Sequence, residues 1–243
     1  MFRTIRVLFK VIVDLIKKRK LLKQVKKLDK EGKEQEVKDK IASVIYDWAK
    51  YCIDITGSTV EVTGLENVPE NGSLVYIGNH QGIFDIPLLL GYIPYQKAFI
   101  AKIEILKIPM ISDWMKLMKC VFIARKNPRQ SIEAMHQGIE NVKNGYSMVI
   151  FPEGTRSKGG PVKEFKPGSF KLAFQSGADI VPVTIDGTWK IYEEHNKINP
   201  ANIKLTIHPP VKTEGLSKDE LRDIPAQVQK TVESALQQNN STN

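Results

Sequence analysis

The spacing of hydrophobic and polar residues changes near residue 56 and divides the chain into two regions. On a helical wheel of residues 2–17, the charged side chains share one stripe roughly 80° wide, and the apolar side chains occupy the broad opposite face. The charged stripe consists of Arg3, Arg6, Lys10, Asp14 and Lys17. The apolar face consists of Phe2, Ile5, Leu8, Phe9, Ile12, Val13, Leu15 and Ile16. Residues 41–55 repeat the helical spacing, so the pattern predicts two amphipathic helices joined by a Lys-rich segment that is either a solvated helix or a linker.

After Gly57 the pattern alternates between short apolar runs and helical segments. The runs predict strands over 58–63, 74–77, 98–102, 119–123, 147–151, 180–185 and 203–208. The segments between them predict helices over 86–90, 105–118, 128–144, 170–175 and 217–238. This alternation is typical of an α/β fold with a mixed, largely parallel sheet flanked by helices. We therefore expect an N-terminal element of two amphipathic helices over residues 1–55 and one α/β domain over residues 56–243.

The positive charge of the chain is concentrated at its N-terminal end. Of the net charge of +9, residues 1–40 supply +8, from fourteen basic and six acidic side chains. The other 203 residues carry 22 basic and 21 acidic side chains, so the body is almost neutral and lacks the basic, aromatic surface of a nucleic-acid binder. A basic segment beside an amphipathic helix favours an anionic membrane surface as partner. An ordinary helix packed on the body is the alternative.

The N-terminal segment does not read as a membrane span. Its apolar runs are at most three residues long, whereas a spanning helix needs about 20. It also lacks the apolar core and cleavage site of a signal peptide. The two cysteines, Cys52 and Cys120, are too far apart to suggest a disulfide framework, and reduced thiols fit a cytosol-facing location. We expect monotopic association with the cytoplasmic face of the cell membrane.

The first candidate for chemistry is a histidine at the end of a buried strand. His80 follows the strand at 74–77, and Asp85 comes five residues later. Five residues turn a straight helix through roughly 500°, so the two side chains can meet only if the chain bends, and Gly82 allows a bend there. A histidine held by a carboxylate is a general base with its orienting group.

Other catalytic arrangements are missing from the sequence. The chain has no Gly-x-Ser-x-Gly turn that would supply a nucleophile, so His80 would activate a hydroxyl of the substrate. It has no His-x-x-x-His or Cys-x-x-Cys pair for a metal, and Ser157-Lys158-Gly159-Gly160 lacks the spacing of a nucleotide-binding loop. We expect neither a metal nor a cofactor.

The second candidate is the polar turn Glu153-Gly154-Thr155-Arg156, which also follows a strand. Arg156 has planar donors suited to a phosphate, Gly154 lets the backbone approach a ligand, and Thr155 adds a hydroxyl. Glu153 would repel a phosphate, so it either bonds a substrate hydroxyl or holds Arg156 or the loop. A plain polar loop is the alternative. Because ligands bind beyond the carboxyl ends of parallel strands, we expect this turn, His80 and Arg125 to lie at one edge of the sheet.

Four stretches together resemble one enzyme family. Asn79-His80-Gln81-Gly82-Ile83-Phe84-Asp85 is similar to the His-x4-Asp box of the glycerolipid acyltransferases, the group that includes the 1-acylglycerol-3-phosphate acyltransferases. Val121–Arg125, Phe151–Ser157 and Val181–Ile185 follow in the order of that family's other blocks, and the likeness spans about residues 60 to 210.

The resemblance implies transfer of a fatty acyl group from a thioester of coenzyme A or acyl carrier protein to the free hydroxyl of 1-acylglycerol-3-phosphate, which gives phosphatidic acid. His80 and Asp85 would be catalytic. The phosphate and glycerol of the lysophospholipid would bind Lys102, Arg125, Glu153, Gly154, Thr155 and Arg156. Val181 and Pro182 would lie on the acyl-donor side, or would simply form a buried strand.

Several alternatives remain at this point. The acceptor could be glycerol-3-phosphate or another lysophospholipid. A hydrolase would use the same base with water, and a non-catalytic lipid-binding module would keep the fold without turnover. The oxyanion of an acyl transfer needs hydrogen-bond donors, and the backbone N–H groups near Gly82 or Gly154 are the candidates.

Overall fold

The structure, a computed structural model, describes residues 2–124 and 127–241. Over these residues seven strands form one sheet in the order β1-β7-β6-β2-β5-β3-β4. All neighbouring strands are parallel except β6 and β7, which are antiparallel. The strands are β1 (Thr59–Thr63), β2 (Leu74–Gly78), β3 (Lys97–Lys102), β4 (Val121–Ile123), β5 (Ser147–Ile150), β6 (Asp179–Asp186) and β7 (Asn202–Ile207). The predicted mixed, largely parallel sheet is confirmed.

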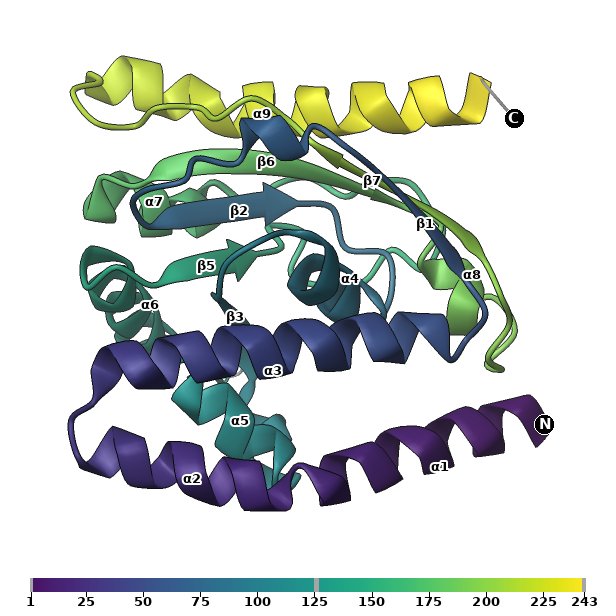
Figure 1. Cartoon of the computed structure of the whole chain (residues 1–243). Coiled ribbons are helices and arrows are strands. Elements are labelled where there is room, and N and C mark those ends of the chain that lie inside the picture. Colours follow the sequence, from purple (N-terminus) through teal and green to yellow (C-terminus); the bar gives the residue numbers. More distant parts are fainter. Residues whose placement is uncertain (1, 125–126, 242–243) are drawn as a thin grey trace.

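Helices flank this sheet (Figure 1). Helix α9 packs along β6 and β2, α6 packs on β4 and β5, and α4 packs against α3. The α-helices are α1 (Phe2–Lys17), α2 (Arg19–Lys30), α3 (Glu34–Asp54), α4 (Asp85–Tyr92), α5 (Ile111–Leu117), α6 (Pro128–Lys143), α7 (Lys171–Ser176), α8 (Trp189–Tyr192) and α9 (Lys218–Ser241). The 3-10 turns are η1 (Leu65–Asn67), η2 (Ile103–Lys107) and η3 (Pro167–Phe170). Only α8, a single turn, had no counterpart among the predicted helices.

Strand β2 lies at the centre of the sheet, and all five of its residues are buried. It pairs in parallel with β5 on one side and β6 on the other, and Ile77 is in register with both Ile150 and Pro182. A central parallel strand is covered on both faces, which explains why its sequence is continuously apolar. Because the three strands run the same way, the segments that follow them all leave from one edge of the sheet.

The N-terminal region forms a helical hairpin (Figure 1). Helices α1 and α2 form its first arm, broken by a turn at Lys18, and α3 returns beside α2. The Lys-rich segment is therefore helical for most of its length. It is also attached to the body, because Leu22 and Val25 are buried and Lys26 forms an ion pair with Asp113 at 2.8 Å.

Two expectations from composition can be compared with the structure. Cys52 and Cys120 are both buried and free, as expected of reduced thiols. Among the helices of the described residues, none has both the length and the apolar character that crossing a bilayer requires.

Candidate active site

His80 and Asp85 meet just beyond the end of β2. His80 lies in the loop after the strand, and Asp85 is the first residue of α4. The bend between them brings His80 Nδ1 to 2.6 Å from Asp85 Oδ2, so the two side chains pair as the sequence predicted. Asp85 is fully buried, whereas the side chain of His80 is 18% exposed. The pair is thus anchored inside the protein and reaches solvent only through the imidazole.

The imidazole of His80 is fixed by two contacts. It lies parallel to the ring of Phe151, with centroids 4.1 Å apart and planes inclined by 10°. Its Nδ1–H donates to the Asp85 carboxylate, which leaves Nε2 as the nitrogen able to accept a proton. The arrangement suits a general base whose tautomer is set by a carboxylate.

Asp85 uses both of its oxygens. Besides His80, Oδ2 accepts the backbone N–H groups of Gln81 at 2.7 Å and Gly82 at 3.0 Å. The hydroxyl of Thr188 donates to Oδ1 in a short hydrogen bond. Thr188 is fully buried and follows β6, the neighbour of β2. The sequence analysis missed Thr188. Like His80, it is a polar residue just past a buried strand, so the same pattern could have identified it.

The backbone amides of residues 80–83 are all bound by carboxylates. His80 N–H donates to Glu153 Oε1 at 2.7 Å, and Ile83 N–H donates to Glu193 Oε1 at 2.9 Å. The amides between them are those bound by Asp85. The loop therefore keeps a fixed shape although it has no regular secondary structure.

These bonds narrow the choice of oxyanion donors, which were expected among the backbone N–H groups near Gly82 or Gly154. The N–H of Gly82 already donates to Asp85, and the N–H of Gly154 donates to the carbonyl of Phe151 at 3.0 Å. Both of these groups are engaged, so neither is available as a preformed oxyanion donor. The sequence could not show this, because the acceptors depend on how the loop folds.

Glu153 holds the loop. Its two oxygens accept the N–H groups of His80 at 2.7 Å and Lys163 at 3.1 Å. Burial of the side chain raises the pKa of Glu153, and these hydrogen bonds oppose the rise. Of the roles considered for Glu153, the contacts in the structure correspond to bracing the loop. The partner of Arg156 is a different carboxylate.

Arg156 pairs with Glu193, a residue that the sequence analysis did not select. Arg156 Nη1 lies 2.8 Å from Glu193 Oε1, and the two side chains are 37% and 3% exposed. Glu193 lies at the end of α8 in a charged stretch, where nothing distinguished it from its neighbour Glu194. The guanidinium keeps an open side, as a ligand-binding arginine needs.

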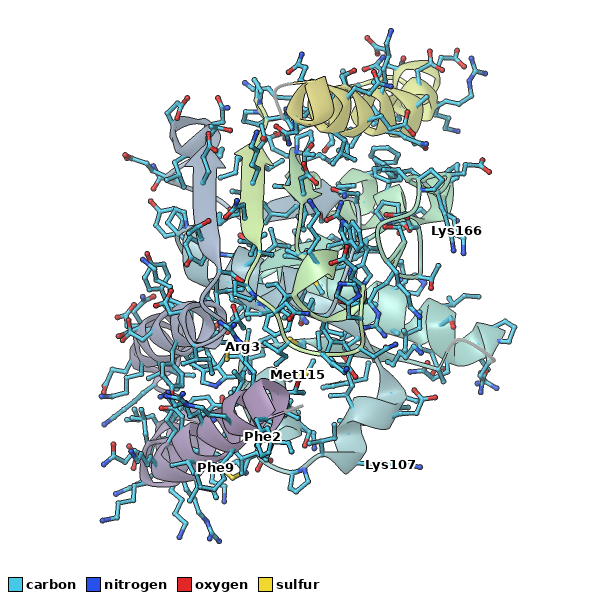
Figure 2. The ribbon with its side chains drawn as sticks, turned by 90° about the vertical axis from the view of Figure 1, so that its right-hand side faces the viewer. Phe2, Arg3, Phe9, Lys107, Met115 and Lys166 are labelled. Carbon is cyan, nitrogen blue, oxygen red and sulfur yellow. The ribbon has the colours of Figure 1, made fainter. Side chains whose placement is uncertain are left out.

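The turn around Gly154 has a second basic neighbour. Gly154 has a φ of +67°, and Lys166 Nζ lies 3.1 Å from the position that a Cβ would occupy there. Lys166 was also missed, because it is twelve positions further along the chain; Figure 2 labels it. Thr155, between Gly154 and Arg156, is exposed. The turn thus offers two cationic groups and a hydroxyl.

The structure shows no hydrogen bond or ion pair between the remaining predicted residues that it describes and the His80–Asp85 pair. Lys102 is the exposed last residue of β3, two strands from β2 at the same edge of the sheet. Arg125 lies outside the described residues. Val181 and Pro182 are buried within β6. In the described ranges, no group of three or more His, Cys, Asp or Glu side chains converges to hold a metal ion.

The sequence is similar to those of known acyltransferases. The chain is 38% identical over 154 residues to the chloroplastic 1-acyl-sn-glycerol-3-phosphate acyltransferase BAT2 of Brassica napus, which is 62% of this chain and 44% of the relative. It is 31% identical over 179 residues to the 1-acyl-sn-glycerol-3-phosphate acyltransferase of Borreliella burgdorferi, which is 72% of this chain and 70% of the relative. The chain spans less than half the length of the plant chloroplast relatives.

A solved structure matches nearly the whole chain. The crystal structure of the 1-acyl-sn-glycerophosphate acyltransferase PlsC from Thermotoga maritima superimposes with a TM-score of 0.78 at 28% identity, covering 98% of both chains. A family model described as Acyltransferase matches residues 59–186. This range is more than half of the chain and includes His80, Asp85 and the turn at residues 153–156, so the chain belongs to the acyltransferase family.

Proposed function

We propose that this protein transfers a fatty acyl group from an acyl thioester to the free hydroxyl of 1-acylglycerol-3-phosphate and so makes phosphatidic acid. The observation that carries the proposal is the His80–Asp85 pair, 2.6 Å apart, on a loop that is tied to Arg156 through Glu193. A base and a cation on one braced loop suit an acceptor that has both a hydroxyl and a phosphate. The acyltransferases named above support the same assignment.

In the proposed reaction His80 acts as general base. Nε2 takes the proton of the acceptor hydroxyl as its oxygen attacks the thioester carbonyl and forms the new C–O bond. Asp85 stabilises the resulting imidazolium. The tetrahedral intermediate then breaks its C–S bond, and the imidazolium returns the proton to the departing thiolate. Atoms and charge balance without an acyl-enzyme.

The phosphate of the acceptor would bind at the turn of residues 154–156. Arg156 is the main donor because its guanidinium is part exposed and fixed on one side by Glu193. Lys166, Lys102 and the hydroxyl of Thr155 supply further donors from the same edge of the sheet, and Arg125 is the remaining candidate. Glu153 serves this site indirectly, by holding the loop.

The donor would be an acyl group on coenzyme A or acyl carrier protein, used as a co-substrate. Val181 and Pro182 are buried and so are poorly placed to contact the acyl donor. The residues just beyond β6 are better candidates for binding it. Gln81 Oε1 accepts the N–H of Gly187 at 2.8 Å, so the segment after β6 is fastened directly to the base loop.

We also propose that α1 lies in the plane of an anionic membrane surface, at the cytoplasmic face. Its outward face presents six apolar side chains, each more than half exposed: Phe2, Ile5, Leu8, Phe9, Ile12 and Ile16. Its inward face contains polar groups, since Arg3 donates to the carbonyl of Thr56 at 2.7 Å and Thr4 Oγ1 accepts the N–H of Ile198 at 2.9 Å. A helix of a water-soluble domain has the opposite arrangement.

The exposed apolar face of α1 suggests that the two regions of the chain have different functions. Residues 1–55 would hold the protein at the surface, where lysophospholipid is found, and residues 56–243 would carry the reaction. Figure 2 shows Phe2 and Phe9 at the end of the molecule opposite α9, and Lys107 at that same end. A basic side chain at the same end of the molecule as an apolar surface favours anionic lipid.

Thioester consumption by the purified protein tests the reaction. We expect consumption that depends on 1-acylglycerol-3-phosphate, with weaker responses to glycerol-3-phosphate and to other lysophospholipids. His80→Ala should lower kcat by roughly 10³-fold or more, because the base is lost while the fold remains. His136→Ala, at an exposed histidine of α6, is the matched control.

The alternatives have distinct results in this assay. Consumption without any acceptor would identify a hydrolase, and no consumption with either carrier would identify a lipid-binding module. Full activity in His80→Ala would remove the proposed base.

A further inference from the structure

Glu193 is a carboxylate with an unusual set of contacts. Its side chain is 3% exposed, and a single oxygen, Oε1, accepts from both Arg156 Nη1 at 2.8 Å and the backbone N–H of Ile83 at 2.9 Å. The other oxygen, Oε2, is buried without a hydrogen-bond partner among the described residues. A desolvated carboxylate that leaves one oxygen unpaired is costly. Its retention here needs a reason beyond packing.

The backbone makes room for this carboxylate. A Cβ at Gly82 would lie 2.5 Å from Glu193 Oε2, so a side chain at that position would push Glu193 away. The glycine in the base loop therefore does more than allow a bend. It lets the carboxylate approach the loop closely enough for Oε1 to reach Ile83.

Glu193 differs from the other carboxylates that hold the base loop. Asp85 belongs to the His-x4-Asp box and Glu153 to the turn of residues 153–156, and both bind the loop. Glu193 comes from a third segment, outside residues 59–186 that the family model matches. Glu193 also connects the loop to the guanidinium proposed to receive the phosphate. One oxygen atom thus joins the base loop to Arg156.

We propose that Glu193 is a positioning residue, which sets Arg156 in register with the His80 loop so that a phosphate bound by Arg156 places the acceptor hydroxyl at the base. The inference rests on the proposed function, because it takes Arg156 as the phosphate-binding group. In a two-point acceptor, the distance between the two recognition groups decides whether binding is productive. Glu193 makes that distance a property of the folded chain, present before the substrate arrives.

Binding and turnover of two acceptors test this role. The probes are 1-acylglycerol-3-phosphate and the matching 1-acylglycerol without phosphate, each in detergent micelles. Glu193→Ala should reduce the binding preference for the phosphorylated acceptor about tenfold, the size of one charge-assisted hydrogen bond, and should also lower kcat. Glu194→Ala, at the exposed neighbour, is the control and should leave both quantities unchanged.

Two further variants separate geometry from charge. Glu193→Gln keeps an acceptor oxygen at the Oε1 position and puts its NH₂ at the unpaired position, so its preference should stay within about threefold of the native value. Glu193→Asp keeps the charge but is too short to reach both donors, and should behave like Glu193→Ala. If Glu193→Ala does not fold in a thermal melt, the comparison of the Asp and Gln variants gives the same answer.

A double-mutant cycle with Arg156→Ala completes the experiment. If Glu193 acts through Arg156, Glu193→Ala should not change the phosphate preference further in the Arg156→Ala background. An equal loss of binding for both acceptors, additive with Arg156→Ala, would overturn the proposal in favour of a purely structural role. Tighter phosphate binding in both the Gln and the Ala variants would overturn it in favour of simple charge competition.

The binding measurements do not depend on turnover. Native protein that prefers the phosphorylated acceptor but transfers no acyl group would disprove the proposed reaction, and the variants would still test Glu193. Native protein that transfers acyl groups with no preference for phosphate would leave the reaction standing and disprove the role of Glu193.

Discussion

At the scale of single residues, the site depends on buried carboxylates that accept hydrogen bonds from the backbone. Asp85, Glu153 and Glu193 together bind the four successive amides of residues 80–83. A carboxylate can only accept hydrogen bonds, and on burial it loses those it made with water. Each buried carboxylate therefore stabilises the loop conformation in which backbone N–H groups replace the lost water. This explains how a loop without regular secondary structure can hold His80, the proposed base, in one position.

Thr188→Val is the sharpest test at this scale. The substitution keeps the shape of the side chain but removes the hydroxyl that donates to Asp85 Oδ1. A buried oxygen left without its donor should cost about 1–3 kcal/mol of unfolding free energy, and the tilted carboxylate should lower kcat about 10- to 100-fold. Urea unfolding and steady-state kinetics measure the two effects.

The conservative variant Thr188→Ser serves as the control. It restores the hydroxyl and should recover most of kcat, even though it loses a buried methyl group. If Val and Ser variants were equally active, the hydrogen bond to Asp85 would have no part in orienting His80.

At the scale of elements, α1 is the exception to the packing of the molecule. The other long helices turn their apolar sides inward, as Val37, Ile41 and Ile45 of α3 do. Helix α1 buries only Val7 and exposes its apolar face. The hydrophobic effect opposes such a surface in water, so the helix is suited to an environment that covers it. A lipid surface fits better than a protein partner because basic residues follow the helix directly.

Phe9→Asp tests the membrane assignment. A charge at the middle of the apolar face should reduce binding to vesicles that contain anionic lipid by about tenfold or more, since a buried aromatic side chain contributes roughly 1.5–3 kcal/mol. Cosedimentation at low and high salt gives the measurement, and the electrostatic part of binding should weaken with salt.

Ile132→Asp on α6 is the matched control, because Ile132 is 60% exposed and remote in sequence from α1. It should bind vesicles like the native protein. Equal loss in both variants would point to a general effect of charge. Formation of a dimer that Phe9→Asp disrupts would assign the face to a second copy of the chain.

At the scale of the whole molecule, the helical hairpin and the sheet share one hydrophobic core. The core runs from Val7 and Leu22 of the hairpin through α3 and α4 to the sheet. A buried lysine lies at the junction of α4 and β3: Lys97 is fully buried, and its Nζ donates to the carbonyls of Ile93, Pro94 and Tyr95 at 2.8, 3.0 and 2.6 Å. It satisfies the carbonyls of the turn that follows α4.

Lys97 predicts how stability depends on pH. Burial lowers its pKa from the usual 10.5 to about 7, so between these values the folded protein releases a proton that the unfolded chain keeps. Stability supplied by this residue should therefore rise with pH across that window, by at most ~1.4 kcal/mol per pH unit. Below pH 7 its contribution should be constant.

Urea unfolding of the native protein and of Lys97→Met at pH 7 and pH 9 measures this effect. The difference between the two proteins should shift in favour of the native chain as the pH rises, because Met does not titrate. Lys171→Met, at an exposed lysine, should show no such shift. A difference that is independent of pH would show that the ammonium stays charged in its ring of carbonyls.

The local pattern of the sequence determined most of the helices and strands along the chain. Alternating strands and helices could be assigned because period and burial are coupled within a few residues, as in the continuously apolar β2. His80, Asp85 and Arg156 could be selected because each lies directly beyond a buried strand or in a motif that matches a known family. The apolar face of α1 was also visible in the spacing of its residues, whereas its outward direction is known only from the structure.

Only the tertiary structure decided which groups hold the site together. Thr188 and Glu193 are more than 100 residues from the loop they brace, and Lys166 reaches Gly154 from a separate segment. Hydrogen bonds depend on angles and distances that no spacing along the chain specifies. For the same reason, the sequence offered the backbone N–H groups near Gly82 or Gly154 as oxyanion donors but could not show that the N–H groups of these two glycines have other acceptors.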